Sequence, residues 1–319
     1  MIIQAMSQST AVPASDALEG VALLSHLGVI RVVGDDAVKF LQGQLTNDFA
    51  LLKPDQARLA AFLSAKGRMQ ASFVGLIRVP GEVLLVCSRD ILEPVRKRLS
   101  MFVMRAKAQL TDATAEIALY GIAGQTVAAL AGAEMPAWSR QDIGDGAQLV
   151  GLPPAGAQAR ALWLAPVGEA PPAGPSMSAE TWRWGEVASG VATLTAPVVD
   201  AFVPQMLNYE SVGGVNFKKG CYPGQEIVAR SQFRGTLKRR AYIVHGDAAL
   251  NVGTEVFHSD DPSQPTGTVV QVAAAPGGGF DAIVSMQIAS TEGGSLHAGS
   301  GDGPLLSLRA LPYRLLDDI

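Results

Sequence analysis

The sequence contains few of the residues that build disulfide frameworks or metal clusters. Only Cys87 and Cys221 are cysteines in a chain of 319 residues, too few for a disulfide framework or a four-cysteine cluster. Its 4 histidines lack metal-ligand spacing such as H-x-x-x-H. We therefore expect a reduced protein without a bound metal.

Long apolar runs and an early positive charge are also missing. No stretch approaches the roughly 18 apolar residues that a membrane-spanning helix needs. No lysine or arginine precedes Arg31, so the first residues lack the charged region of a secretory signal. These absences predict a cytoplasmic protein that does not bind the membrane.

Positive charge is scarce overall. The net charge is −4, and 48% of the residues are hydrophobic against 17% charged, the balance of a soluble globular protein. An acidic chain does not coat nucleic acid or anionic membranes non-specifically. Any binding of anions must therefore come from a local basic patch.

Strand and helix patterns alternate through the first half. LGVIRVVG (27–34) predicts a strand, and residues 35–52 predict a helix with apolar residues at helical spacing behind an aspartate N-cap. Residues 58–87 predict three strands joined by tight turns. A further helix is expected from Asp90, with Glu93 completing a capping box.

The predicted secondary structure of the second half changes at two points. Residues 151–177 are rich in proline, glycine and alanine and predict a looping connection with one short strand, followed by a helix over 178–190 capped by Ser178. From about residue 241, short strand-like runs separated by turns predict a β-barrel or sandwich. We therefore expect an α+β fold divided into a tail (1–20), an α+β domain (21–238) and a small C-terminal β-barrel (239–319).

One cysteine lies in the most basic part of the chain. Tyr222 to Gln225 fit a type II turn, with proline second and glycine third, and Cys221 precedes that turn. Neighbouring Lys219 would favour the thiolate. Seven basic residues fall between 218 and 240, against the single acid Glu226: Lys218, Lys219, Arg230, Arg234, Lys238, Arg239 and Arg240.

Simpler interpretations exist for each of these features. A lone cysteine is commonly a small buried hydrophobic residue, which is the interpretation for Cys87 within VLLVC. A basic run is commonly a solvated face, and this one lacks interleaved aromatic residues. On a helix, Glu226 and Arg230 would form an ordinary i,i+4 pair.

The stretch FVPQMLNYESVGGVNFKKGCYPGQEIVARSQFRGTLKRRAY (202–242) resembles the signature of the YgfZ-type folate-binding proteins of the aminomethyltransferase (glycine-cleavage T-protein) superfamily. Their hallmark, K-G-C-aromatic-x-G-Q-E, is matched by Lys219 to Glu226. GDDAVKFLQGQLTNDF (34–49) is similar to the family's opening helix, and SAKGRM (64–69) to its following hairpin. With the barrel, the resemblance covers nearly the whole chain.

The resemblance implies a folate-binding domain of two α+β lobes, followed by the barrel, around a central opening. It also implies tetrahydrofolate or a one-carbon derivative as cofactor, and a role in keeping iron–sulfur enzymes active, including those that thiolate tRNA. Trp182 matches a tryptophan that the family places at the folate site, where it would stack on an aromatic ring. Without the resemblance, Trp182 would be read as a core aromatic.

Further residues complete the expected site. Cys221 is the candidate catalytic thiol and Lys219 its stabilising cation. Arg230 and Arg234, with Lys238, would pair with the carboxylates of folate. The expected folate-binding residues are Trp182, Leu27, Arg230, Arg234 and Gln225.

The chain departs from the family at three positions. A second family tryptophan is replaced by Leu27. The acid that T-proteins carry two residues before the glycine matching Gly190 is replaced by Ala188. Their catalytic aspartate has no clear counterpart, although Asp90 lies in the same window. These departures weaken the case for a true aminomethyltransferase.

Three functions are therefore weighed. The first is a folate-binding accessory protein for iron–sulfur cluster assembly or repair, a monomer whose partners are iron–sulfur enzymes or assembly proteins and which affects tRNA indirectly. The second is a folate-dependent aminomethyltransferase or demethylase, which would depend on substrate positioning and a general base. The third is a non-catalytic tRNA-binding module that uses the basic residues of 218–240.

Overall fold

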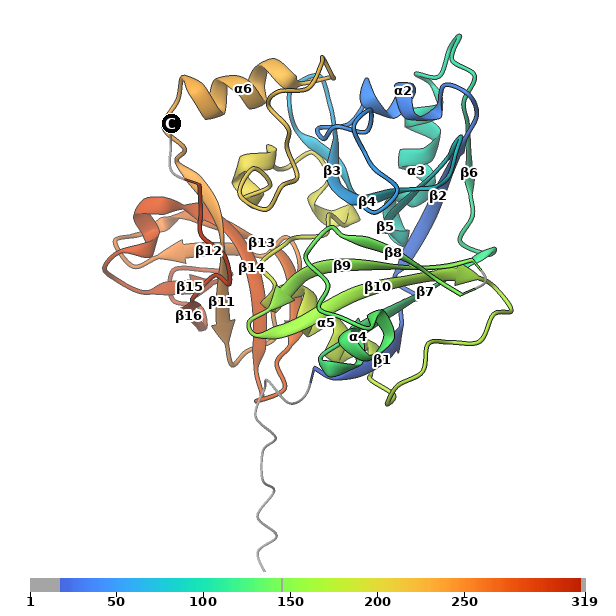
Figure 1. The fold of residues 1–319 in the computed structure, drawn as a ribbon. Coiled ribbons are helices and arrows are strands. Elements are labelled where there is room, and N and C mark those ends of the chain that lie inside the picture. The colour runs from blue at the N-terminus through green and yellow to red at the C-terminus, as the bar shows by residue number, and fades with distance from the viewer. Residues whose placement is uncertain (1–17, 145, 317–319) are drawn as a thin grey trace, which may run out of the picture.

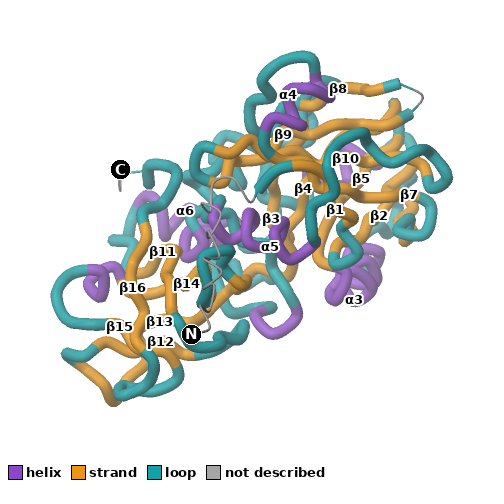
Figure 2. Tube along the Cα trace, turned by 90° about the horizontal axis from the view of Figure 1, so that it is seen from below, coloured by secondary structure: helices purple, strands orange, loops and turns teal. Residues whose placement is uncertain are grey.

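The computed structural model describes residues 18–144 and 146–316 (Figure 1). It contains two five-stranded antiparallel sheets and a closed six-stranded barrel. Figure 2 shows the barrel at one end of the molecule and the two sheets at the other. The predicted class, two α+β lobes followed by a small barrel, is confirmed.

The first lobe contains the sheet β3-β4-β5-β2-β6. Its elements are β2 (Leu27–Val33), α2 (Ala37–Gln42), β3 (Ala57–Leu63), β4 (Met69–Val79), β5 (Glu82–Ser88), α3 (Arg89–Ser100) and β6 (Gln109–Asp112). The predicted strand at 27–34 and the three strands of 58–87 are all present. Apolar side chains of α2 and α3 pack on the sheet to form this lobe's core.

The predicted helix over 35–52 is wrong beyond its first turns. Helix α2 ends at Gln42, and the Gln42 side-chain oxygen accepts a hydrogen bond from the backbone N–H of Phe49 at 2.8 Å. Asn47 and Asp48 likewise accept from the N–H groups of Asp48 and Leu51. Such local bonds replace helical ones. The apolar residues still reach the core, but from turns.

The predicted capping box of α3 is also wrong. Ser88 is the N-cap, and its hydroxyl donates to the carboxylate of Asp90 at 2.7 Å. Glu93 instead pairs with Arg96, at 2.8 Å. Pro94 therefore lies inside the helix rather than in its first turn.

The second lobe contains the sheet β1-β7-β10-β9-β8. Its elements are β1 (Gly20–Leu23), β7 (Ile117–Ala123), α4 (Gln125–Ala131), β8 (Arg140–Ile143), β9 (Ala147–Ala155), β10 (Gln158–Pro166) and α5 (Ala179–Ala188). Helix α5 begins as predicted, because the Ser178 hydroxyl accepts a hydrogen bond from the N–H of Thr181 at 3.0 Å.

The loop predicted over 151–177 is partly a β-hairpin. Strand β9 continues through Pro153 and Pro154 to Ala155 and pairs with β10. The register shifts between Gln158 and Arg160, opposite the prolines. Proline is tolerated in strands at such irregularities. The high proline content therefore predicted a loop where the chain forms this hairpin.

The barrel follows the order β11-β14-β13-β12-β15-β16. Its strands are β11 (Arg239–Gly246), β12 (Glu255–His258), β13 (Asp261–Ala274), β14 (Phe280–Gln287), β15 (Leu296–Ala298) and β16 (Leu305–Arg309), and a 3-10 turn, η3 (Ile288–Thr291), follows β14. Between the second lobe and the barrel lie η1 (Ala196–Val198), η2 (Pro204–Leu207) and α6 (Gln225–Phe233). A closed barrel leaves no sheet edge unpaired.

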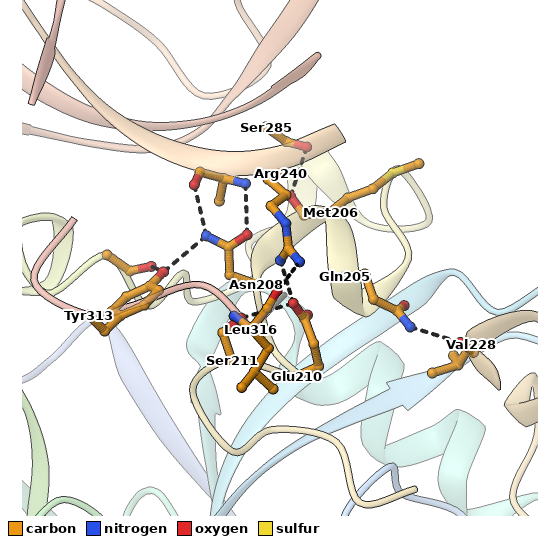
Figure 3. Close-up of polar contacts among 12 residues, drawn as sticks. Gln205, Met206, Asn208, Glu210, Ser211, Val228, Arg240, Ser285, Tyr313 and Leu316 are labelled. Atoms are coloured by element: carbon orange, nitrogen blue, oxygen red, sulfur yellow. Dashed lines mark hydrogen bonds and ion pairs between the residues drawn. The ribbon is translucent and has the colours of Figure 1, made fainter. Parts of the chain in front are cut away.

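Buried polar side chains after η2 connect the barrel to the rest of the chain (Figure 3). Asn208, in the left-handed conformation, both donates to the carbonyl of Ala241 at 2.8 Å and accepts from its N–H at 3.2 Å. The Asn208 amide also donates to the Tyr313 hydroxyl at 3.1 Å, and that hydroxyl donates to the carbonyl of Gly190 at 2.8 Å. One asparagine thus links η2, β11 and the C-terminal segment.

A buried ion pair lies beside this asparagine. Arg240 donates to the carboxylate of Glu210, and both side chains are almost inaccessible to solvent. Arg240 also donates to the carbonyl of Leu316 at 2.8 Å (Figure 3). A paired buried charge is retained only with such hydrogen bonds, so this pair fixes the barrel's first strand against the segment after η2.

Candidate functional site

The predicted turn after Cys221 is confirmed. Gly224 has φ 78° and ψ 0°, the values of the third residue of a type II turn. The N–H of Gln225 donates to the carbonyl of Tyr222 at 3.2 Å. Helix α6 begins immediately after the turn, at Gln225. We call residues 216–224 the cysteine loop.

The cysteine loop is held by the first lobe. A Cβ atom on Gly224 would lie 2.6 Å from the carbonyl oxygen of Ser64 and 2.7 Å from the Cα of Gly67. One on Gly67 would lie 2.8 Å from the Cβ of Ile227. Two glycines therefore allow the turn and the β3–β4 hairpin to touch, backbone on backbone.

Residues 42–47 hold the other side of the cysteine loop. The Lys219 ammonium donates to the carbonyls of Gln42, at 2.6 Å, and Leu45. The N–H of Asn216 donates to the carbonyl of Thr46 at 2.9 Å. The three sequence stretches that carry the family resemblance thus meet around one loop (Figure 1).

Lys219 is largely buried, and its ammonium lies 4.9 Å from the centre of the Tyr222 ring. Burial lowers the pKa of Lys219 to about 8. The ammonium therefore titrates closer to neutral pH than that of an exposed lysine does. Its hydrogen bonds go to backbone carbonyls, whereas its predicted partner was the thiol.

The two cysteines have opposite environments. Cys221 is exposed, and its sulfur has no hydrogen-bond partner among the residues described. Cys87 is buried in the first lobe, and burial raises the pKa of its thiol to about 12. Because the thiolate is the reactive form, Cys221 is the cysteine that can react with solvent or a partner. Beside it, Gly220 has open space where a side chain would be.

Trp182 and Leu27 line a cavity between the two lobes. It has about 590 Å³ of empty space, counting the part open to solvent, and side chains of both sheets, α5 and the segment after α5 form its walls. The Trp182 ring is only 1% exposed and packs on Gly121, where a Cβ would lie 2.4 Å from the indole. Trp182 is therefore a core aromatic that also forms part of the cavity wall.

Two buried charges in this cavity were missed by the sequence analysis. The Arg160 guanidinium lies 4.5 Å from the centre of the Trp182 ring. Its one hydrogen bond goes to the carbonyl of Pro153 at 3.4 Å, and its Nε has no partner among the described residues. Burial lowers the pKa of Arg160 to about 10. Burying a cation with so few partners costs folding free energy. Charged groups with such perturbed pKa values are common in ligand-binding sites.

Glu186 is the second buried charge. Its carboxylate accepts from the Trp182 indole N–H at 2.9 Å and from the Gln271 amide at 3.3 Å, and it lies 3.1 Å from Nε2 of His26. Glu186 follows Trp182 by four residues on α5, so helical spacing alone places both on one face. Arg160 could have been found as the one charge within the apolar run ARALWLA.

The other predicted residues lie elsewhere. Arg230 is on α6 and Arg234 is the residue that follows it as C-cap, and both line a groove that shares no lining residue with the cavity. Arg230 pairs with Glu226 at 2.8 Å, with both side chains exposed, so the simple i,i+4 interpretation is confirmed for that pair. Gln225, the first residue of α6, is partly exposed. The structure therefore groups Leu27 with Trp182 and separates both from the basic residues.

The two positions compared with the T-proteins are also outside the cavity. Ala188 lines a different hollow, between the β9–β10 hairpin and the barrel. The Asp90 carboxylate accepts hydrogen bonds from Ser88 and from the N–H of Ala196. The acid that does face the cavity is Glu186.

The described residues contain neither a membrane-spanning helix nor a cluster of metal ligands. None of the helices in residues 18–144 and 146–316 combines the length and apolar character needed to cross a membrane. Within the same residues, no three histidine, cysteine or acidic side chains converge as metal ligands would.

Comparison with solved structures defines the class of protein. The fold is similar to that of the glycine cleavage system aminomethyltransferase T from Bartonella henselae, with a TM-score of 0.68 over 94% of this chain and 88% of that one, at 16% sequence identity. The protein therefore has the aminomethyltransferase fold.

Sequence comparison defines the family. The chain is 31% identical over 315 residues to the tRNA-modifying protein YgfZ of Escherichia coli O157:H7, covering 92% of each chain. It is 30% identical over 310 residues to the protein of the same name from Escherichia coli O127:H6. No protein-family model matches the chain. The chain belongs to the YgfZ family, as the sequence resemblance predicted.

Proposed function

We propose that this protein binds tetrahydrofolate, or a one-carbon derivative of it, in the cavity between the two lobes. The observation that carries this proposal is the buried, under-partnered guanidinium of Arg160 lying over Trp182 beside the carboxylate of Glu186. A ligand that accepts hydrogen bonds would satisfy Arg160, whose desolvation the contacts with Trp182 and Pro153 compensate only in part.

The pterin ring of folate suits these walls. It is flat, so it can lie against aromatic and apolar side chains such as Trp182 and Leu27. Its edge carries both acceptors and donors, which match a guanidinium and a carboxylate respectively. The leucine at position 27 provides contact area but no aromatic face. We therefore expect weaker stacking than two tryptophans would give.

We further propose that folate binding supports the activity of iron–sulfur enzymes, including those that thiolate tRNA, in the cytoplasm. The relatives are called tRNA-modifying proteins, which supports a link to tRNA. The exposed Cys221 would act as the functional thiol toward a partner, and Lys219 would set the position and charge of its loop. The protein would act as a monomer.

An aminomethyltransferase activity is less well supported. Ala188, which replaces an acid of the T-proteins, and Asp90, which lies in the window of their catalytic aspartate without being a clear counterpart, do not line the cavity. Glu186 is the one carboxylate that could act there, and it already accepts two hydrogen bonds.

Calorimetric titration with tetrahydrofolate tests the proposal. We expect saturable binding by the wild type, and at least tenfold weaker binding by Glu186→Gln, because a neutral amide pairs less strongly with ring N–H donors. Cys221→Ser is the matched control, with unchanged affinity but lost support of a partner enzyme. Absence of binding by the wild-type protein would refute the proposal.

A further inference from the structure

A basic groove runs between α6 and the start of the barrel. It has about 1,180 Å³ of empty space, counting the part open to solvent. Four of its lining residues are basic, and none of the described residues that line it is acidic: the basic ones are Arg230, Arg234, Lys238 and Arg239. We call it the α6 groove. On a chain with net charge −4, this is a concentrated positive site.

Most of this charge is available to a ligand. Among the described residues, the side chains of Arg234 and Lys238 have no partner. Arg239 uses one nitrogen, which donates to the carbonyl of Thr266 at 3.0 Å. Arg230 is paired only with the exposed Glu226, and exposed pairs are weak. Phosphates could therefore compete for all four cations.

An aromatic side chain lies beside the cations. Phe233 is 52% exposed and packs edge-on against Phe217, with ring centres 5.3 Å apart. It lines a second hollow on α6 that shares Arg230 and Arg234 with the groove. Phe233 lies between Arg230 and Arg234 in the sequence, so the expectation of a basic run without interleaved aromatic residues is wrong. Since residues at i, i+3 and i+4 share one face of a helix, Phe233 lies on the same side of α6 as these cations.

We infer that the α6 groove binds RNA directly, with its basic residues on consecutive phosphates and Phe233 stacked on an unpaired base. Cations that follow a backbone and an exposed aromatic ring beside them are the two elements of single-stranded RNA binding. Folate carboxylates would occupy some of the cations but would leave Phe233 unused. The inference does not depend on folate binding, because no residue lines both sites.

Fluorescence anisotropy with a labelled, unmodified tRNA transcript, and with a labelled 15-mer of oligouridylate, tests this inference. The full-length protein is compared with Arg234→Glu/Lys238→Glu. The control is Arg98→Glu/Lys107→Glu, which changes the net charge equally at exposed cations of the first lobe. A third variant, Phe233→Ala, removes the aromatic ring without changing the charge.

We expect wild-type affinity to fall with salt, with a slope of about −3 in log–log form, since each of the four phosphate contacts contributes about −0.7 on a single strand. Arg234→Glu/Lys238→Glu should weaken binding at least tenfold and flatten the slope by about 1.5. Phe233→Ala should weaken binding about tenfold with the slope unchanged. The control should stay within about twofold of the wild type.

Several results would overturn the inference. One is the absence of RNA binding by the wild type at 50 mM salt, about the low end of such titrations. Another is an equal loss in the groove and control variants, which would indicate non-specific attraction. A third is an unchanged RNA affinity in Arg234→Glu/Lys238→Glu combined with weaker binding of tetrahydrofolate polyglutamate. That outcome would assign the groove to the folate tail.

Discussion

Replacing Arg160 by methionine should leave the protein about as stable as before while removing ligand binding. Burial shifts the pKa of Arg160 from 12.5 to about 10, a penalty on the charged form of about 3 kcal/mol. The methionine variant recovers this penalty because it carries no charge. It also loses the cation–π contact with Trp182, worth about 2 kcal/mol when desolvated. The 3.4 Å bond to Pro153 adds less than about 1 kcal/mol. The free energy of unfolding should therefore stay within about 1–2 kcal/mol of the wild-type value.

Folate affinity should respond differently. A hydrogen bond from a charged donor is worth about 1.5–3 kcal/mol, so Arg160→Met should weaken tetrahydrofolate binding by about 10- to 150-fold. Urea unfolding and calorimetry on the same preparations measure both quantities. The matched control is Arg140→Met, another buried arginine, whose guanidinium donates to Asp142 and to the carbonyl of Pro54.

The control should lose about 1–3 kcal/mol of stability and keep its folate affinity. The reasoning is refuted if Arg160→Met is as destabilised as Arg140→Met while binding folate normally. Arg160 would then be a structural residue whose desolvation the fold already compensates.

Three further outcomes are expected. Gly224→Ala should destabilise the protein by about 2–4 kcal/mol in urea unfolding, through the positive φ and the backbone contacts, whereas Gly220→Ala, with open space at its Cβ, should change it by under about 0.5 kcal/mol; equal effects would contradict the loop geometry. Glu210→Gln should cost about 1.5–3 kcal/mol by replacing the charge-assisted hydrogen bond between Arg240 and the Glu210 carboxylate with a neutral one, and a loss under about 0.5 kcal/mol would argue against a strong buried ion pair between these two residues. Burial lowers the pKa of Lys219 from 10.5 to about 8, so the unfolded chain binds more protons between these values and stability relative to Lys219→Met should rise with pH across that range; a flat difference in denaturation free energy would exclude this titration.

Much of the fold could be predicted from local sequence patterns. The β-branched run 27–34, the hydroxyl cap at Ser178 and the Pro-Gly turn before α6 formed as predicted, because their conformations are set by neighbouring residues. Errors arose where side-chain hydrogen bonds to the backbone or the pairing of strands overrode the local pattern. Residues 43–49 left the helix because side chains bonded the nearby backbone, and Pro153 was accommodated at an irregularity of the strand pairing.

The candidate site was predictable only in part. Trp182 and Leu27 were placed by resemblance, and the structure brings them to one cavity. Arg160 was missed because a single charge in an apolar strand has no local signature, and its proximity to Trp182 depends on the packing of α5 against the sheet. The prediction placed Arg230 and Arg234 in one folate site with Trp182, whereas the structure places them in a separate groove. Distance between elements cannot be read from a run of charges.

The contacts of the cysteine loop also set an order of events during synthesis. Lys219 is bound by the carbonyl of Gln42, 177 residues earlier in the chain, and Gly224 rests on the hairpin that contains Gly67. Synthesis runs from the N-terminus and N-terminal parts generally fold first, so the residues of the first lobe that hold the loop are already present when Cys221 is translated. The exposed thiol of Cys221 therefore takes its position only after the residues that hold its loop have been made. A nascent chain that stops short of this loop would contain both segments that hold the loop but not the thiol.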